Sequence, residues 1–254
     1  MRAHAGRSAH FARVFRAAGA LLFVVSLAYF FIAYLTSFGV VTSDRDTASA
    51  VTWNVTIFTL FALHHSIFAR MRIRNWVAQT VPAELERSVY VWIASLLFIG
   101  VCAWWRPVAG IVWQTTGSAS WVLWTVQAAG VWLTLRGALV LDVWELAGLR
   151  RPEGLRSPSP GESADAPGLE ATGSVEFKTT GPYGWVRHPI YAGWFLFVWG
   201  ASTMTMTRLT FATVSCLYLL VAIPMEERTM RAQAGAAYER YMAKVRWRLM
   251  PGVY

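Results

Sequence analysis

Six apolar runs dominate this sequence, and each is roughly 17 to 24 residues long, the length that an α-helix needs to cross a bilayer. Inside a bilayer every backbone N–H and C=O group needs a partner within the protein, and a continuous helix supplies one. The sequence therefore predicts an all-α integral membrane protein with about six transmembrane helices, ending in a C-terminal helical hairpin and a cytosolic amphipathic tail. The predicted spans are Ala17–Val40, Ala50–Phe68, Ser88–Trp105, Ser120–Leu141, Tyr191–Thr207 and Leu209–Met225.

The distribution of positive charge predicts the orientation of these helices. Only 15% of the residues are charged and 56% are hydrophobic, whereas a soluble domain is about a quarter charged. Segments 1–16, 70–87, 142–188 and 226–254 hold 19 of the 23 Lys and Arg residues, and the loops on the other side hold three. Because positively charged loops stay in the cytosol, we expect both termini there, in a bacterial inner (cytoplasmic) membrane. The net charge of +9 then reflects topology and does not call for a nucleic-acid partner.

Polar, aromatic and glycine residues crowd the mouth of the fifth predicted span. Residues 181–193 read G-x-Y-x-x-x-R-H-P-x-Y-x-G. Pro189 suits the first turn of a helix, where its missing N–H costs nothing, so Arg187 and His188 should immediately precede that helix. The next two spans return the chain to the same side and bring Glu226–Glu227 opposite these residues. Two cationic or hydrogen-bonding groups and two carboxylates predict a site for a small zwitterionic or cationic ligand.

The motif, the hairpin, the Glu-Glu pair and the basic tail, together residues 178–254, resemble the membrane methyltransferase superfamily. That superfamily includes isoprenylcysteine carboxyl methyltransferases and phospholipid N-methyltransferases, which use S-adenosylmethionine. Other stretches are similar to the bacterial methanethiol S-methyltransferase group, namely 63–70, 82–90, 105–113 and 142–150. The resemblance implies methyl transfer from S-adenosylmethionine to a small thiol, methanethiol becoming dimethyl sulfide, at the cytosolic membrane face.

The resemblance also implies which residues hold the cofactor. Arg187 would bind the cofactor's carboxylate, and Glu226, or Glu227 in its place, would accept hydrogen bonds from its ribose or amino group. The full cofactor-binding set that we expect is Tyr183, Arg187, His188, Pro189, Tyr191, Gly193, Glu226 and Glu227.

The transfer itself needs alignment and a proton acceptor. Displacement at a sulfonium methyl is in line, so the protein mainly has to align nucleophile, methyl group and sulfur. A neutral thiol must also lose a proton, which calls for a base unless the thiolate binds directly. The catalytic candidates are His64 and His65 at the end of the second span and Glu145 beyond the fourth, and the sequence does not choose among them. Each has a structural alternative, namely interfacial packing for the histidines and pairing with an arginine for Glu145.

One departure from the family pattern concerns the methyl acceptor. The isoprenylcysteine enzymes carry an arginine one turn before the acidic pair, where it recognises a carboxylate, and this chain has Ala222 and Ile223 there. A buried carboxylate without a partner is costly, so a carboxylate acceptor is disfavoured. The alternatives are a lipid amine or another lipophilic thiol or selenol as acceptor, or a non-enzymatic accessory membrane protein of nitrogen-oxide metabolism.

The chain is expected to be a single polytopic methyltransferase domain over residues 1–254. Residues 1–150 would form an N-terminal four-span bundle, and residues 178–254 the cofactor-binding hairpin and tail. Residues 152–173 are rich in Pro, Ser, Gly and acidic residues, which predicts a flexible cytosolic insert. The expected partners are a small thiol and the lipid bilayer, without nucleic acid or metal, since the two cysteines lie in apolar runs that show no ligand spacing.

Overall fold

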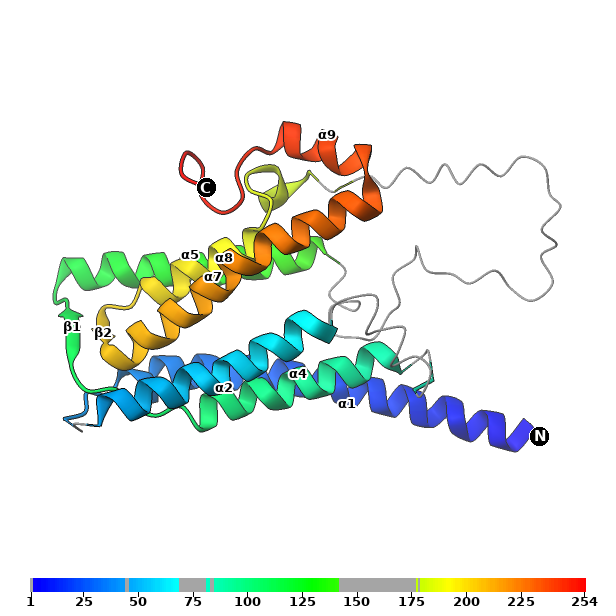
Figure 1. Ribbon diagram of the computed structural model, residues 1–254, viewed down its shortest axis with the longest axis horizontal. Coiled ribbons are helices and arrows are strands. Elements are labelled where there is room, and N and C mark those ends of the chain that lie inside the picture. Colours follow the sequence, from blue (N-terminus) through cyan, green and yellow to red (C-terminus); the bar gives the residue numbers. More distant parts are fainter. Residues whose placement is uncertain (1, 44–45, 69–80, 83–84, 142–176, 178) are drawn as a thin grey trace.

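The computed structural model describes residues 2–43, 46–68, 81–82, 85–141, 177 and 179–254, which are mostly helical (Figure 1). The helices are α1 (Arg2–Leu35), α2 (Thr47–Phe68), α4 (Glu86–Ala103), α5 (Ser118–Val140), α7 (Pro189–Trp199), α8 (Met206–Ala234) and α9 (Ala236–Lys244). Two short 3-10 helices, η1 (Ser37–Gly39) and η3 (Gly181–Gly184), and two strands, β1 (Ile111–Gln114) and β2 (Thr203–Thr205), complete the described elements. The predicted insert at 152–173 lies outside the described residues.

Three described helices are long and apolar enough to cross a bilayer, in the regions His10–Gly39, Glu86–Ala103 and Met206–Ala234, as an integral membrane protein requires. Helices α2 and α5, with 22 and 23 residues, lie where the second and fourth spans were predicted. Helix α7 has 11 residues and rises only ~16 Å, about half of the ~30 Å hydrocarbon core. The fifth predicted span, 191–207, is therefore not one continuous helix, and the count of six spans stays a prediction.

The chain turns between α7 and α8 earlier than the sequence predicts. We predicted the turn at Thr207–Arg208, but α7 ends at Trp199 and α8 begins at Met206. Strand β2 lies between these helices and pairs antiparallel with β1, which ties two interhelical connections together. The prediction of a loop over 106–119 missed β1, because strands of three and four residues are too short to show an alternating pattern.

Arg208, predicted in an outer loop, is a buried residue of α8. Its backbone N–H donates to Thr205 Oγ1 over 3.1 Å, which caps the helix. All three guanidinium nitrogens donate to backbone carbonyls, at 3.0 Å to Tyr34, 3.0 Å to Leu35 and 2.6 Å to Thr203. The last carbonyls of a helix have no partner within it, so Arg208 satisfies the end of α1. The loop prediction was wrong because a cation can be buried where carbonyl oxygens match its donors.

The helices form two layers (Figure 1). Helices α1, α2 and α4 pack together in one layer, and α5 packs along α7 in the other, while α8 contacts both α7 and α2. Two glycines allow the close approach of α5 and α7. A Cβ on Gly130 would lie 2.6 Å from the carbonyl oxygen of Gly193, and a Cβ on Gly193 would lie 2.7 Å from the backbone nitrogen of Thr134.

Aromatic side chains hold the two layers together. The buried ring of Phe30 on α1 lies 4.7 Å from that of Trp194 on α7, 5.2 Å from that of Phe211 on α8 and 5.5 Å from that of Phe98 on α4. Such pairs contribute about 0.5–1.5 kcal/mol each beyond the area that they bury. The core therefore fixes α7 and α8, which carry the predicted site, against the N-terminal helices.

Candidate active site

The start of α7 places the polar motif as the sequence predicts. Pro189 is the first residue of α7, and Arg187 and His188 precede it, so the predicted helix start is confirmed. The backbone N–H groups of Arg187 and His188 donate to the carbonyl oxygens of Trp247 and Arg248, both over 2.9 Å. Neither N–H has a partner within α7 because each lies before its first turn. The segment that follows α9 is thus hydrogen-bonded to the motif.

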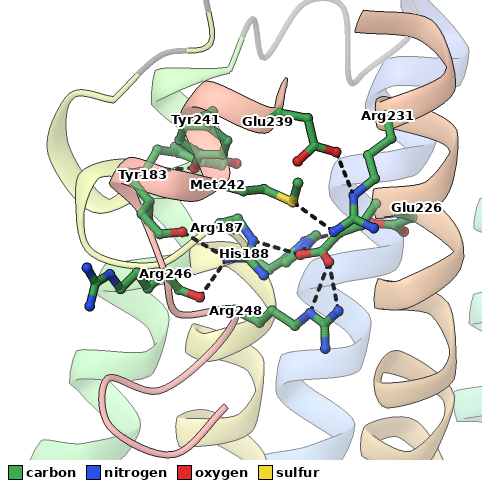
Figure 2. Close-up of polar contacts among 12 residues, drawn as sticks. Tyr183, Arg187, His188, Glu226, Arg231, Glu239, Tyr241, Met242, Arg246 and Arg248 are labelled. Carbon is green, nitrogen blue, oxygen red and sulfur yellow. Dashed lines mark hydrogen bonds and ion pairs between the residues drawn. The ribbon is translucent and has the colours of Figure 1, made fainter. Parts of the chain in front are cut away.

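Glu227 is the centre of a charged cluster with Arg187, His188 and Arg248, and Figure 2 labels these three partners. Its side chain is 2% exposed. Oε1 accepts from Arg187 Nε over 2.8 Å and lies 3.3 Å from His188 Nε2, while Oε2 accepts from Arg248 Nε over 3.0 Å and lies 2.9 Å from Arg248 Nη2. The hydrogen bond to Glu227 raises the pKa of Arg248. Both oxygens of Glu227 are therefore committed within the protein.

Glu226 shares the same end of α8 but is much less committed. Tyr191 donates its hydroxyl to Oε1 over 2.6 Å, and His188 Nδ1 lies 3.9 Å from Oε2. The side chain of Glu226 is 39% exposed, against 2% for Glu227. Since a carboxylate offers about four acceptor positions, Glu226 keeps the capacity to bind a donor from a ligand.

Arg187 is bound to the protein on several sides. Its side chain is 8% exposed, and besides Glu227 it donates from Nη1 to the carbonyl oxygens of Val245 (2.8 Å) and Arg246 (2.6 Å). Arg248 is 30% exposed and reaches the same cluster from the other side. Arg248 is therefore the more accessible of the two guanidinium groups.

Two other residues of the predicted cofactor set have a clear structural environment. Tyr183 in η3 accepts a hydrogen bond from the Tyr241 hydroxyl at its backbone carbonyl over 3.0 Å, and burial raises the pKa of the Tyr183 phenol. Gly193 faces the backbone of α5, where any side chain would collide. Gly193 therefore allows α7 to pack closely against α5.

The structure describes two of the three predicted catalytic residues, His64 and His65. Glu145 falls outside the described residues. His64 and His65 occupy the last turns of α2, and the Tyr90 hydroxyl on α4 lies 2.8 Å from His65 Nδ1. The ring of His64 is stacked on that of Tyr90, with the centroids 5.8 Å apart.

The residues that stand in for the carboxylate-binding arginine are buried. Ile223 is 0% exposed and packs with Val186, Ala192 and Leu249, and Ala222 is 8% exposed. Ile223 therefore offers no open surface to a methyl acceptor. This corrects the part of the sequence argument that used Ile223 to disfavour a carboxylate acceptor. Ala222 shares a helical face with Glu226, four residues on.

Sequence reasoning missed Arg248 and Tyr90. It predicted only a basic amphipathic tail after the hairpin, whereas α8 runs on to Ala234 and Gly235, with φ +48°, turns the chain into α9. Arg248 is a basic residue that follows the tail helix. That position is a sequence signal that could have marked it as a partner of the acidic pair. No sequence signal marks Tyr90, because it meets His65 only through the packing of α2 and α4.

Comparisons with known proteins agree with the resemblance seen in the sequence. Residues 171–232 match the isoprenylcysteine carboxyl methyltransferase (ICMT) family. The chain is 33% identical to methanethiol S-methyltransferase 2 of Bradyrhizobium diazoefficiens, over 87% of this chain and 86% of that protein. It is 32% identical to methanethiol S-methyltransferase 1 of the same organism, over 92% and 82%, and 32% identical to the methanethiol S-methyltransferase of Crocosphaera subtropica, over 80% and 76%. No solved structure shows a significant match.

The helical membrane fold, the charged cluster and these matches define an integral membrane methyltransferase. The chain belongs to the same family as these methanethiol S-methyltransferases, and within it residues 171–232 match the ICMT family. The alternative of a non-enzymatic accessory protein is thereby set aside.

Proposed function

We propose that this enzyme transfers the methyl group of S-adenosylmethionine to a small thiol, converting methanethiol to dimethyl sulfide. The observation that carries the proposal is the unequal commitment of the acidic pair. Glu227 is saturated by Arg187, His188 and Arg248, whereas Glu226 keeps open acceptor positions beside them. The names of the relatives that align over most of the chain support the thiol as acceptor.

The residues present fit S-adenosylmethionine, which supplies an activated methyl group on a sulfonium sulfur. Glu226 can accept hydrogen bonds from ribose hydroxyls or from the amino group, and its charge favours a nearby cation. Arg248, 30% exposed, is the better placed of the two arginines to meet the carboxylate of the ligand. Tyr191 and His188, with parallel rings 5.5 Å apart, fix the direction of the Glu226 side chain.

Arg187 and Glu227 then act as the support of the site. Arg187 links Glu227 on α8 to the carbonyls of the segment after α9, so three parts of the chain are held in one arrangement. A fixed arrangement of binding groups is what an in-line displacement requires. Pro189 and Gly193 contribute by starting α7 and by seating it on α5.

We place the site at the cytosolic face of the bacterial cytoplasmic membrane, with both termini cytosolic. The support is the excess of Lys and Arg in segments predicted to be cytosolic. A reporter fused after Tyr254 should read cytosolic, and one inserted at Gly117 should read external. Two reporters on the same side would contradict this topology.

The test of the function is methyl transfer by the purified protein in detergent. S-adenosylmethionine labelled in its methyl group would be offered with methanethiol, phosphatidylethanolamine or a prenylcysteine at matched concentrations. We expect label in dimethyl sulfide and little in the other products. The Glu226→Gln variant should lose this transfer, whereas Glu239→Gln, which alters an exposed carboxylate paired with Arg231, should retain it. A prenylcysteine or lipid amine as the better acceptor would overturn the assignment.

A further inference from the structure

A hydroxyl–imidazole pair lies on helices that carry none of the proposed cofactor-binding residues. The Tyr90 hydroxyl in the first turns of α4 lies 2.8 Å from His65 Nδ1 on α2, within hydrogen-bond distance, and the two ring centroids are 5.8 Å apart. Within Thr47–Phe68, His64 and His65 are the only ionisable side chains. Any proton acceptor that α2 provides must therefore be one of these two imidazoles.

This pair lies close to the cofactor-binding carboxylate. Tyr90 and Tyr218 are within electrostatic range of Glu226, and Tyr191 donates directly to Glu226. Helix α8 packs on α2, where the Tyr218 hydroxyl lies 3.1 Å from Ser66 Oγ, one residue after His65. The hydroxyls of Tyr90, Tyr191 and Tyr218 thus gather where the two layers meet.

The geometry of displacement decides the side from which the acceptor approaches. The nucleophile must meet the methyl group opposite the departing sulfur. The proposed cofactor residues come from α7, α8 and the segment after α9, namely Tyr191, Glu226 and Arg248. The acceptor then approaches from the side of α2 and α4, which presents Tyr90 and His65.

We propose that Tyr90 and His65 form a proton relay that ionises the thiol acceptor, an inference that rests on the proposed thiol methyl transfer. The S–H proton passes to Tyr90 Oη while the Tyr90 proton passes to His65 Nδ1, leaving a thiolate and an imidazolium. The thiolate sulfur forms the new S–CH₃ bond, and the electron pair of the breaking bond stays on the sulfonium sulfur, which becomes neutral. His65 then returns its proton to water, so one proton is released per thioether formed.

Glu226 is a poorer base for the same thiol. It already accepts the Tyr191 hydroxyl over 2.6 Å. A proton taken from the thiol would neutralise the carboxylate that is proposed to hold the cofactor and would weaken cofactor binding during the reaction. The Tyr90–His65 pair avoids this conflict because it holds the proton on α4 and α2, outside the proposed cofactor-binding residues.

The test compares two thiols of similar size in the Tyr90→Phe and His65→Gln variants. Ethanethiol needs a base to ionise near neutral pH, whereas 2,2,2-trifluoroethanethiol is far more acidic and supplies its own thiolate. With ethanethiol we expect both variants to lose about 100-fold in turnover, the lower range for general base catalysis. With trifluoroethanethiol we expect the turnover of both variants to stay within about threefold of the unaltered enzyme, since a large fraction of this thiol is already ionised in solution. Calorimetric binding of S-adenosylhomocysteine should be unchanged.

Tyr218→Phe is the matched control, because it removes a hydroxyl of the same cluster whose hydrogen-bond partner is Ser66 and not an imidazole. It should leave both thiols unaffected. An equal loss with the two thiols in Tyr90→Phe, or no loss with either, would overturn the relay while leaving the methyltransferase assignment intact. If the unaltered enzyme binds S-adenosylhomocysteine but methylates neither thiol, the proposed function has failed and the relay with it.

Discussion

The two ends of α8 each bury an ionised side chain, and they satisfy it by different means. Arg208, 7% exposed near the start of α8, meets three backbone carbonyls. Glu227, about 30 Å further along the helix, meets Arg187, His188 and Arg248. The first arrangement matches donors to acceptors and closes the end of α1. The second arrangement places several charged side chains beside Glu226, which stays 39% exposed. The unused acceptor positions of Glu226 distinguish this binding site from the purely structural contacts of Arg208.

Removing Glu227 should have the largest effect on stability. It tests whether the charged end of α8 depends on one carboxylate. Glu227→Ala leaves Arg187 and Arg248 without their counterion in a mostly buried setting, which should lower the free energy of unfolding by about 3–5 kcal/mol. Unfolding in detergent, followed by heat or denaturant, measures this. Glu239→Ala is the control, and its exposed ion pair with Arg231 should contribute about 0–1 kcal/mol. Equal effects of the two substitutions would refute the central role of Glu227.

Replacing Arg208 tests the opposite end. Arg208→Met leaves buried carbonyls of Tyr34, Leu35 and Thr203 without their donor, which should cost about 3 kcal/mol of stability. The affinity for S-adenosylmethionine should not change in protein that remains folded. Arg208→Lys should recover only part of the stability, because an ammonium group cannot reproduce the planar fork of three nitrogens. A specific loss of cofactor affinity in Arg208→Met would show that this end also binds ligand.

Glu226→Gln separates binding from stability at the charged end. Losing a charged acceptor should weaken S-adenosylmethionine binding by about 2 kcal/mol, or about 30-fold. The unfolding free energy should change by no more than about 0.5 kcal/mol, because Glu226 is partly exposed and has few protein partners. Calorimetry on the purified variant gives the affinity. Normal binding here, together with lost binding in a folded Glu227→Gln protein, would reverse the roles of the two glutamates.

The smallest expected effect concerns how Glu226 is directed. Tyr191→Phe removes one hydroxyl that donates to Oε1 over 2.6 Å, so cofactor affinity should fall by about 1 kcal/mol, roughly fivefold. The Glu226→Gln, Tyr191→Phe double variant should lose less than the sum of the two single effects, since both act on one interaction. Strict additivity would show that the Tyr191 hydroxyl acts independently of Glu226.

Features set by local chemistry were predictable from the sequence. Pro189 starts α7 because proline lacks only an N–H that the first turn does not use, so the position of Arg187 and His188 just before the helix followed directly. Prediction failed where distant groups decide the outcome. Arg208 resembles a loop residue until the end of α1 supplies carbonyls, and α7 ends at Trp199 where apolar composition alone would continue it.

The sequence by itself determined a membrane protein of apolar helices and the residue types at its charged end, since both follow from hydropathy and from a continuous motif. Tertiary structure alone decided the difference between Glu226 and Glu227. Adjacent residues on a helix point about 100° apart, so one carboxylate turns into the cluster of Arg187, His188 and Arg248 while its neighbour faces Tyr191 and stays accessible. It also decided that Tyr90 meets His65, because a hydrogen bond between two helices depends on how they pack and leaves no pattern along the chain.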